Sequence, residues 1–347
     1  MPAVAVADEL RDRGATVTFL GARGRVEAEL VPEAGYEIDL LDLSGIDRKN
    51  PLKAARAATQ AAAAMPKARK ALVRRGADVV MGGGGFVAGP AGLAARSKSI
   101  PLVLTEADRH LGLANRLLAK RADRVCLAFP IDGLSGEHVM VTGRPVNRQV
   151  LSADRTSARE RFGISPEAQA VLVMGGSLGA RTINFAALEA FAGRNGRKFE
   201  VIHVSGKRDY VELKSKLGEA VHQEGYTLLE YEPDMGDSLA ACDLVVGRSG
   251  GSIFELTAVG RPAILVPYPY ATGDHQTANA SWMFDAEAAK VVSDADLSAE
   301  LLASLVPRLL ADSDGLARMS ANSAALARPE AATDIADQVM AVAKGES

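Results

Sequence analysis

Residues 245–280 read VVGRSGGSIFELTAVGRPAILVPYPYATGDHQTANA. The apolar start of this segment is typical of a buried parallel strand, and its glycines allow a tight turn before a helix that begins near Ser252. A second apolar run, 263–266, leads into a polar loop at residues 274–279. Because α/β sheets bind ligands at the carboxyl ends of their strands, the segment predicts both an α/β fold and a binding site.

The glycine turn of this segment has the chemistry of an anion site. Free N–H groups and the partial positive charge of a helix N-terminus stabilise a pyrophosphate without a metal. Glu255 lies one turn into the helix and is placed to accept hydrogen bonds from two ribose hydroxyls. The structural alternative is a capping box, in which Ser252 caps the helix and Glu255 is its partner. A short glycine turn alone favours the alternative, and the second polar cluster shifts the balance towards a ligand.

The composition describes a globular chain without a membrane anchor. It has 347 residues, of which 48% are hydrophobic and 24% charged, enough for two domains of ordinary size. The net charge of −3 argues against nucleic acid as the main partner. No apolar run reaches the length of a membrane span, and acids near the N-terminus argue against a signal peptide. We therefore expect a protein that is made and kept inside the cell.

Neither the cysteines nor the acids predict a metal site. Cys126 and Cys242 lie far apart in apolar runs and are expected to be reduced core residues. The pair Asp294 and Asp296 has the spacing of a divalent-cation motif. However, it precedes a predicted amphipathic helix, where aspartates commonly cap, and no glycine turn or polar cluster is expected around it. No metal and no cofactor is therefore predicted.

Strand-like apolar runs alternate with helical stretches along the chain, which predicts parallel sheets covered by helices. The expected strands are 15–20, 36–43, 77–81, 100–104, 122–129, 138–142, 170–174, 199–204, 226–231, 243–246, 263–266 and 289–293. The pattern restarts after a helical connector at 152–162, so we expect two doubly wound, Rossmann-like domains that face a cleft. Their expected boundaries are 1–147 and 148–328, with a last helix in 329–347 that packs back on the first domain.

One helical segment, 51–75, combines small apolar residues with many cations. Its cations are Lys53, Arg56, Lys67, Arg69, Lys70, Arg74 and Arg75. The segment is suited to contact an anionic membrane surface. The alternative is a solvated cationic face on an alanine-rich helix, because large aromatic and leucine side chains are scarce. Pro66 is expected to kink or split this helix.

Glycine-rich turns follow three of the expected strands, at 82–85, 175–179 and 250–251. Glycine at a strand end permits close backbone approach to a sugar or phosphate. The alternative is tight packing between helix and strand, which we expect for at least one of the three turns.

Four motifs occur in one order along the chain: GGGGFVAGPAGLAA, GGSLGARTIN, GRPV, and RSGG followed by GDHQTANA. Together they resemble the MurG family of peptidoglycan N-acetylglucosaminyltransferases over nearly the whole length, and diacylglycerol glycosyltransferases share parts of the pattern. The resemblance implies a two-domain glycosyltransferase B-type fold that holds UDP-N-acetylglucosamine mainly in the second domain. It also implies a peripheral protein at the cytoplasmic face of the membrane, where the first domain receives undecaprenyl-pyrophosphoryl-N-acetylmuramoyl-pentapeptide. Other cell-wall synthesis enzymes, and roles in cell shape and division, are implied as well.

The resemblance assigns roles to individual residues. The substrate-binding residues that it implies are Gly176, Ser177, Glu232, Gly250, Gly251, Ser252, Glu255 and Gln276. Ser177 would contact the donor near its diphosphate, Glu255 the ribose, and Gln276 the hydroxyls of N-acetylglucosamine. Glu232 falls where the family holds the uracil ring through main-chain groups.

Three stretches depart from the family pattern. Where many members read HEQN, residues 105–108 read TEAD, which places Asp108 where an asparagine contacts the donor. Where many read GNPVR, residues 143–147 read GRPVN, so that the arginine moves to Arg144 or Arg148 and Asn147 stands in its place. The RSGG turn is also one residue shorter before Glu255 than in those members.

The implied reaction is an inverting transfer, in which the muramoyl 4-hydroxyl attacks the anomeric carbon in line with departing UDP. Amides of the glycine turn, with Arg144 or Arg248, would stabilise the diphosphate. Glu106, Asp108 and His110 are the candidate bases for the hydroxyl proton. The alternatives are a diacylglycerol glycosyltransferase, an epimerase that acts on UDP-N-acetylglucosamine alone, and a non-catalytic paralogue that binds the UDP-sugar.

The resemblance also implies a strand and a glycine-rich loop ahead of the first helix, which starts here at Pro2. The first strand of the first domain is therefore expected to be missing. Because that strand would be central, its loss would leave unpaired backbone edges under the helix. We expect from this that Met1 is not the natural start.

Overall fold

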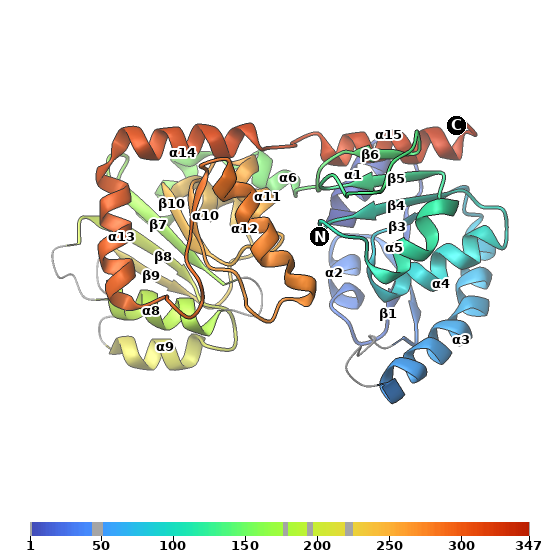
Figure 1. The fold of residues 1–347 in the computed structure, drawn as a ribbon, viewed down its shortest axis with the longest axis horizontal. Helices are drawn as coiled ribbons and strands as arrows, with labels where there is room; N and C mark the ends of the chain where they lie inside the picture. Colours follow the sequence, from blue (N-terminus) through green and yellow to red (C-terminus); the bar gives the residue numbers. More distant parts are fainter. Residues whose placement is uncertain (1, 44–50, 176–179, 193–196, 219–224, 347) are drawn as a thin grey trace. The chain divides into compact units, whose positions relative to one another are not determined.

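The chain folds into two compact α/β units (Figure 1). The computed structural model describes residues 2–43, 51–175, 180–192, 197–218 and 225–346, without the side chains of 51–58 and 272. Unit 1 contains Met1–Pro145 and Glu330–Ser347, and unit 2 contains Val146–Pro329. Each unit has parallel strands connected by helices, so the expected Rossmann-like class is confirmed for both.

Unit 2 is built on one six-stranded parallel sheet with the order β12-β11-β10-β7-β8-β9. The strands are β7 (Gln169–Met174), β8 (Phe199–Val204), β9 (Tyr226–Leu229), β10 (Leu244–Gly247), β11 (Ala263–Leu265) and β12 (Ala289–Val291). The chain runs outward from β7 in one direction and outward from β10 in the other. This reversal makes the carboxyl ends of β7 and β10 the switch point, where doubly wound sheets bind ligands.

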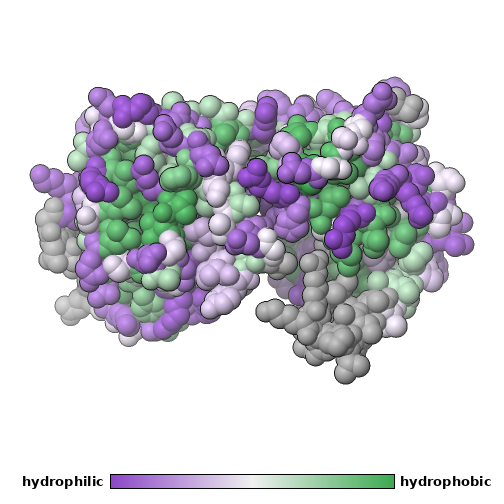
Figure 2. Space-filling view, in the orientation of Figure 1, coloured by the Kyte–Doolittle hydropathy of each residue, from purple (hydrophilic) through white to green (hydrophobic). Residues whose placement is uncertain are grey.

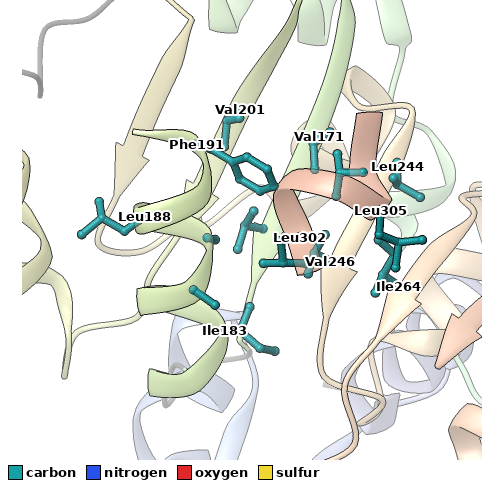
Figure 3. Packing of buried hydrophobic residues seen from close by; sticks show 14 of the residues in the cluster. Val171, Ile183, Leu188, Phe191, Val201, Leu244, Val246, Ile264, Leu302 and Leu305 are labelled. Carbon is teal, nitrogen blue, oxygen red and sulfur yellow. The ribbon is translucent and has the colours of Figure 1, made fainter. Parts of the chain in front are cut away.

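Helices cover both faces of this sheet. They are α6 (Arg148–Leu151), α7 (Arg155–Phe162), α8 (Arg181–Phe191), α9 (Tyr210–Leu217), α10 (Met235–Ala241), α11 (Ile253–Ala258), α12 (His275–Asp285), α13 (Ala299–Ala311) and α14 (Ser313–Ala325). Figure 3 shows Phe191 of α8 near Val201 of β8, and Leu302 of α13 near Val246 of β10, within one buried cluster. Leu172 of β7 lies between Val171 and Val173, which belong to that cluster, and it is also fully buried. Burial on both faces explains why these strands read as continuous apolar runs.

Unit 1 contains two parallel sheets with the orders β1-β2 and β3-β4-β5-β6. The strands are β1 (Thr18–Ala22), β2 (Glu37–Leu41), β3 (Val80–Gly82), β4 (Leu102–Glu106), β5 (Arg124–Leu127) and β6 (Val139–Val141). Ala22 and Leu41 of the first sheet share one buried cluster with Leu102 and Leu104 of the second. Within the described part of the chain, β1 and β3 are not paired with each other.

The helices of unit 1 bring the two ends of the chain together. They are α1 (Pro2–Asp12), α2 (Glu27–Glu33), α3 (Pro51–Arg75), α4 (Gly85–Arg96), α5 (Leu113–Leu118) and α15 (Ala331–Ala343). Val6 of α1 and Val339 of α15 lie in one buried cluster, and the two helices lie side by side in Figure 1. Helix α3 continues through Pro66 and is not split there, while the alternative expectation of a kink stays a prediction.

The surface and the cysteines agree with a globular chain. Hydrophilic side chains cover most of the visible surface of both units, with smaller hydrophobic areas between them (Figure 2). None of the helices in the described ranges is long and apolar enough to cross a membrane. Cys126 and Cys242 are free and buried, as expected, and burial raises the pKa of Cys126 to about 12 and that of Cys242 to about 11.

A buried polar chain connects β8, β9 and α8 in unit 2. His203 Nδ1 lies 2.7 Å from the Tyr226 hydroxyl, and His203 Nε2 lies 3.1 Å from Asn184 Oδ1. The Asn184 amide donates to Ser205 O and to Asp209 Oδ2, both at 2.8 Å, which turns its oxygen towards the histidine. His203 therefore donates from Nε2 and accepts at Nδ1 as a neutral ring. Burial lowers its pKa to about 3.

We expect His203 to make the protein less stable as the pH falls below about 6.5. In the unfolded chain the ring takes up a proton near its ordinary pKa of 6.5, whereas in the folded chain it does so near 3. The contribution of His203 to stability is therefore fully present above pH 6.5 and is lost as the pH falls towards 3, by at most about 1.4 kcal/mol per pH unit. Urea unfolding of the wild type and of His203→Gln between pH 5 and 7 measures this slope. Identical slopes for the two proteins would refute a neutral buried ring.

Candidate functional site

The loops after β10, β11 and β12 emerge at one edge of the unit 2 sheet, because these neighbouring strands are parallel. Residues 248–252 connect β10 to α11, and residues 266–274 connect β11 to α12. The sequence-predicted residues Arg248, Gly250 and Gln276 lie on these two loops or at their ends. The structure thus places the glycine turn and the polar loop of the segment at one site.

Two glycines next to β10 have different roles. A Cβ on Gly247 would lie 2.9 Å from Met174 O of the neighbouring strand, so Gly247 is required by packing. Gly250 does not have a positive φ, and a Cβ there would lie 3.8 Å from Gln276 Nε2. Neither the backbone nor the packing of the described residues requires glycine at 250. Its missing side chain leaves space next to the Gln276 amide for a ligand.

The capping-box alternative for Ser252 is wrong. Ser252 has helical φ and ψ of −62° and −18° and makes no side-chain cap bond in the described structure. The N–H groups of Ile253 and Phe254 bond the carbonyls of Gly250 and Gly251, both at 3.3 Å. The turn itself, rather than the first amides of the six-residue helix α11, is therefore the candidate anion contact.

Gln276 and Asn279 connect the two loops. Gln276 Oε1 accepts a hydrogen bond from Tyr268 N at 2.9 Å, and Ser249 Oγ donates to Gln276 O at 2.7 Å. Asn279 Nδ2 donates to Ser249 O at 3.0 Å. Asn279 Oδ1 is buried and has no hydrogen-bond partner in the described part of the chain. The Gln276 NH₂ group therefore faces Gly250, and the acceptor oxygen of Asn279, three residues further along the same helix, is left unpaired among the described residues.

This combination is suited to recognise hydroxyl groups, which both donate and accept hydrogen bonds. Asn279 belongs to the polar run of the segment but was not among the residues predicted to bind substrate. Its signal is the spacing of three residues from Gln276 on α12, which places both side chains on one helix face. Only the structure shows that Asn279 Oδ1 has no hydrogen-bond partner among the described residues, because the partners of this oxygen depend on which segments pack against α12.

Arg248 is engaged within the protein rather than open towards a diphosphate. Its Nη1 donates to Val266 O at 3.1 Å and to Pro267 O at 3.4 Å. The same nitrogen lies 2.5 Å from Asp294 Oδ1, and the guanidinium lies 5.4 Å from the centre of the Tyr268 ring. Only 9% of Arg248 is exposed. Arg248 therefore connects the loops that follow β10, β11 and β12. Its engagement in these contacts does not support the predicted contact with the diphosphate.

The surroundings of Asp294 correct a second expectation. Asp294 lies in the polar cluster next to the glycine turn, where the sequence predicted none, and it also accepts a hydrogen bond from Thr182 Oγ1 at 3.2 Å. Asp296 instead accepts from Ser293 Oγ at 2.6 Å. The two carboxylates thus have separate partners. Across the described ranges, no group of three or more His, Cys, Asp or Glu side chains has the arrangement of a metal site.

Other predicted substrate residues lie elsewhere or have structural partners. Glu232 is 3% exposed, and both its oxygens lie 2.9 Å from Arg161 Nη2. Asn147 caps α6 by accepting from Gln149 N at 3.0 Å. Arg144 is half-buried and lies next to Pro145, where the first of the two segments of unit 1 ends. These contacts explain the side chains of Glu232 and Asn147 without a substrate.

Gly176 and Ser177 lie outside the described residues. Their predicted contact with the donor diphosphate therefore stays a prediction. The described residues on either side are Met174, which ends β7, and Ala180, which precedes α8. The carboxyl end of β7 is one side of the switch point of the sheet.

Glu106 organises the loop after β4 in unit 1. It is 8% exposed and accepts hydrogen bonds from Ala107 N at 3.0 Å, Asp108 N at 3.3 Å and Gly112 N at 2.8 Å. Asn115 Nδ2 adds a fourth at 3.0 Å. A carboxylate with its lone pairs occupied in this way is a poor acceptor for a substrate proton. Of the predicted bases, half-buried Asp108 and exposed His110 on the same loop remain candidates.

The cations of α3 whose side chains the structure describes divide into two groups, whereas the side chains of Lys53 and Arg56 lie outside the described part of the chain. Lys67 pairs with Asp42 at 2.7 Å, Arg74 pairs with Asp39 at 2.6 Å, and Arg75 pairs with Asp39 at 3.1 Å. Hydrogen bonds from Arg75 and Arg74 lower the pKa of Asp39. These three cations are therefore largely neutralised by acids at β2 and just after it.

The second group borders an open groove. Arg69 and Lys70 are exposed and have no ion-pair partner among the residues that the structure describes. Together with Lys98 they line a groove of about 710 Å³, whose lining also includes the apolar side chains Ala62, Met65 and Val73. Arg74, which pairs with Asp39, lines the groove as well. The lining therefore combines apolar side chains with cations, of which Arg69 and Lys70 are not neutralised by an acid that the structure describes.

Comparison with known proteins assigns both halves of the chain. Residues 1–127 match the glycosyltransferase family 28 N-terminal domain, and residues 170–339 match the glycosyltransferase family 28 C-terminal domain. A curated relative from Halorhodospira halophila is the UDP-N-acetylglucosamine–N-acetylmuramyl-(pentapeptide) pyrophosphoryl-undecaprenol N-acetylglucosamine transferase. It is 38% identical to this chain over 345 residues, which are 99% of this chain and 95% of the relative.

Solved structures share the fold. The crystal structure of Acinetobacter baumannii MurG has a TM-score of 0.77 and 28% identity, and the match covers 98% of this chain and 95% of that one. A UDP-GlcNAc 2-epimerase from Neisseria meningitidis, solved with UDP-GlcNAc bound, has a TM-score of 0.66 at 16% identity, with 97% and 95% covered. At that identity the epimerase shows a common fold and nothing about activity.

Proposed function

Because the chain belongs to the UDP-N-acetylglucosamine–N-acetylmuramyl-(pentapeptide) pyrophosphoryl-undecaprenol N-acetylglucosamine transferases of glycosyltransferase family 28, we propose that it catalyses this transfer. The donor is UDP-N-acetylglucosamine and the acceptor is the 4-hydroxyl of undecaprenyl-pyrophosphoryl-N-acetylmuramoyl-pentapeptide, in peptidoglycan synthesis. The observation that carries the proposal is the Gln276 NH₂ group directed towards Gly250, with the unpartnered amide oxygen of Asn279 on the same helix.

The proposed donor site divides the UDP-sugar among three groups of residues. Main-chain amides at Gly250, together with Gly176 and Ser177, receive the diphosphate. Gln276 and Asn279 hydrogen-bond the hydroxyls of the sugar. Glu255, in the first turn of α11, accepts from the ribose hydroxyls. Uncharged amides suit the sugar end, because they recognise hydroxyls without the cost of desolvating a charge.

The transfer needs one proton acceptor and one stabilised leaving group. The acceptor oxygen forms a bond to the anomeric carbon while the bond to UDP breaks, and the electron pair leaves with UDP. Preorganised N–H groups at the diphosphate stabilise this developing charge. The hydroxyl proton goes to a general base, for which Asp108 and His110 are the candidates. The configuration at the anomeric carbon is inverted in a single displacement.

We also propose that unit 1 binds the anionic surface of the membrane that holds the lipid acceptor, as a peripheral protein on the cytoplasmic side. The support is the groove of α3, in which Arg69, Lys70 and Lys98 border apolar side chains. Basic clusters attract anionic lipids, while apolar side chains between them reach the acyl boundary. The paired cations Lys67, Arg74 and Arg75 contribute less, because nearby acids offset their charge.

One assay separates the proposed activity from its rivals. Radiolabelled UDP-N-acetylglucosamine is incubated with the purified lipid-linked muramoyl-pentapeptide, and we expect label in a lipid-linked disaccharide. Conversion of the donor without any lipid would identify an epimerase, and transfer to diacylglycerol instead would identify a lipid glycosyltransferase. Donor binding without turnover of either acceptor would identify a non-catalytic paralogue and refute the proposal.

A further inference from the structure

Asp294 connects segments that line the proposed donor site. It follows β12, the edge strand of the unit 2 sheet. Its Oδ1 lies 2.5 Å from Arg248 Nη1 in the loop after β10, and its Oδ2 accepts from Thr182 Oγ1 at 3.2 Å. Thr182 lies in the first turn of α8. One carboxylate thus joins the residue after β10 to the helix that follows β7.

Arg248 carries this connection on to the loop after β11. Its Nη1 donates to Val266 O at 3.1 Å and to Pro267 O at 3.4 Å. The next residue, Tyr268, donates its N–H to Gln276 Oε1 at 2.9 Å. This bond occupies the oxygen of the Gln276 amide and leaves its NH₂ group towards Gly250. A continuous series of contacts therefore leads from Asp294 to the amide that we propose reads the sugar.

The burial of the pair makes the carboxylate necessary. The side chain of Arg248 is 10% exposed and that of Asp294 is 23% exposed. A guanidinium at this depth without an opposite charge would be strongly unfavourable and would move towards water. Arg248 would then release the carbonyls of Val266 and Pro267, which fix the start of the loop.

We propose that Asp294 is a positioning residue for sugar recognition, which holds Arg248 and through it the Gln276 amide. The inference rests on the proposed function, because the sugar contact of Gln276 is assigned there. Asp294 itself touches no substrate in this scheme. Asp296, two residues on, is exposed and bonds only the Ser293 hydroxyl in the described structure, so it is a matched control.

The test compares UDP-N-acetylglucosamine with UDP, which lacks the sugar. In Asp294→Asn the amide oxygen still accepts from Thr182, but the neutral NH₂ group faces the guanidinium. We expect calorimetry to show a Kd for UDP-N-acetylglucosamine about 10- to 100-fold higher, and a Kd for UDP changed by less than about threefold. Asp296→Asn should change neither. Equal weakening of both ligands would show general damage to the domain and overturn the proposal.

A second comparison covers the case in which Asp294→Asn folds poorly in thermal melting. Arg248→Met with Asp294→Asn removes both charges, which a buried pair tolerates better than the loss of one. If Asp294 acts through Arg248, the double variant binds UDP-N-acetylglucosamine as Arg248→Met alone does, whereas additive losses would overturn the proposal. Wild type that fails to bind UDP-N-acetylglucosamine refutes the proposed function. If the wild type binds UDP-N-acetylglucosamine and Asp294→Asn binds it with the same Kd, only this inference is refuted.

Discussion

Gln276→Ala is expected to weaken UDP-N-acetylglucosamine binding by about one to two decades, because lost hydrogen bonds to a bound hydroxyl cost about 1–3 kcal/mol. UDP binding should be nearly unchanged, since the proposed contact of Gln276 is with the sugar. Glu255→Ala should weaken both ligands by a similar factor, since ribose is common to them. The two variants therefore divide the donor site into a sugar end and a nucleoside end.

Calorimetry with both ligands measures these effects, and melting temperatures show whether each variant is folded. Thr277→Ala is the matched control, because Thr277 is exposed, lies next to Gln276, and bonds Asp274 at 2.7 Å rather than the glycine turn. It should bind both ligands as the wild type does. Unchanged affinity in Gln276→Ala and Glu255→Ala together would remove the proposed donor site from this edge of the sheet.

The second large effect concerns membranes. Replacing Arg69, Lys70 and Lys98 with glutamine should reduce binding to anionic vesicles by roughly 100-fold, because each basic residue near such a surface contributes about 1 kcal/mol. Binding of the wild type should weaken as salt rises, because screening shortens the reach of the charges. Sedimentation with phosphatidylglycerol vesicles at two salt concentrations measures both effects.

The control removes an ion pair between α3 and the residue after β2 without changing net charge. Lys67→Gln with Asp42→Asn deletes the pair that lies 2.7 Å apart and should leave vesicle binding near the wild-type level. Its comparison with the triple variant separates the groove from the rest of α3. If the triple variant sediments as well as the wild type, the membrane contact lies elsewhere on the protein.

The pattern of apolar runs determined the fold class. Each of the twelve expected strands is present, and their ends differ from the predicted ends by a few residues. Burial on both faces makes a parallel strand a continuous apolar run, so the signal is local and visible in the sequence. Of the two effects expected at Pro66, a kink or a split, the split does not occur, because a single proline does not by itself end a helix whose other residues favour it.

The site was only partly visible in the sequence. The placement of Gln276 and the Gly250 turn at neighbouring strand ends could be predicted from their short spacing, whereas their contacts with the donor stay a prediction. The roles of Ser252 and Arg248 could not, because cap geometry and ion pairing depend on which groups the fold brings within reach. The same reason explains Glu106, whose carboxylate the loop amides occupy.

The sequence by itself determined a two-domain α/β protein, a glycine turn followed by a polar helix, and motifs that resemble one glycosyltransferase family. Only the tertiary structure decided which charges are available. It pairs Lys67 with Asp42 but leaves Arg69 exposed, and it joins Asp294 to Arg248 while Asp296 stays at the surface. In each case the two like charges are only two residues apart in the sequence, which does not tell them apart. Their ion pairing is set by distance and burial in three dimensions.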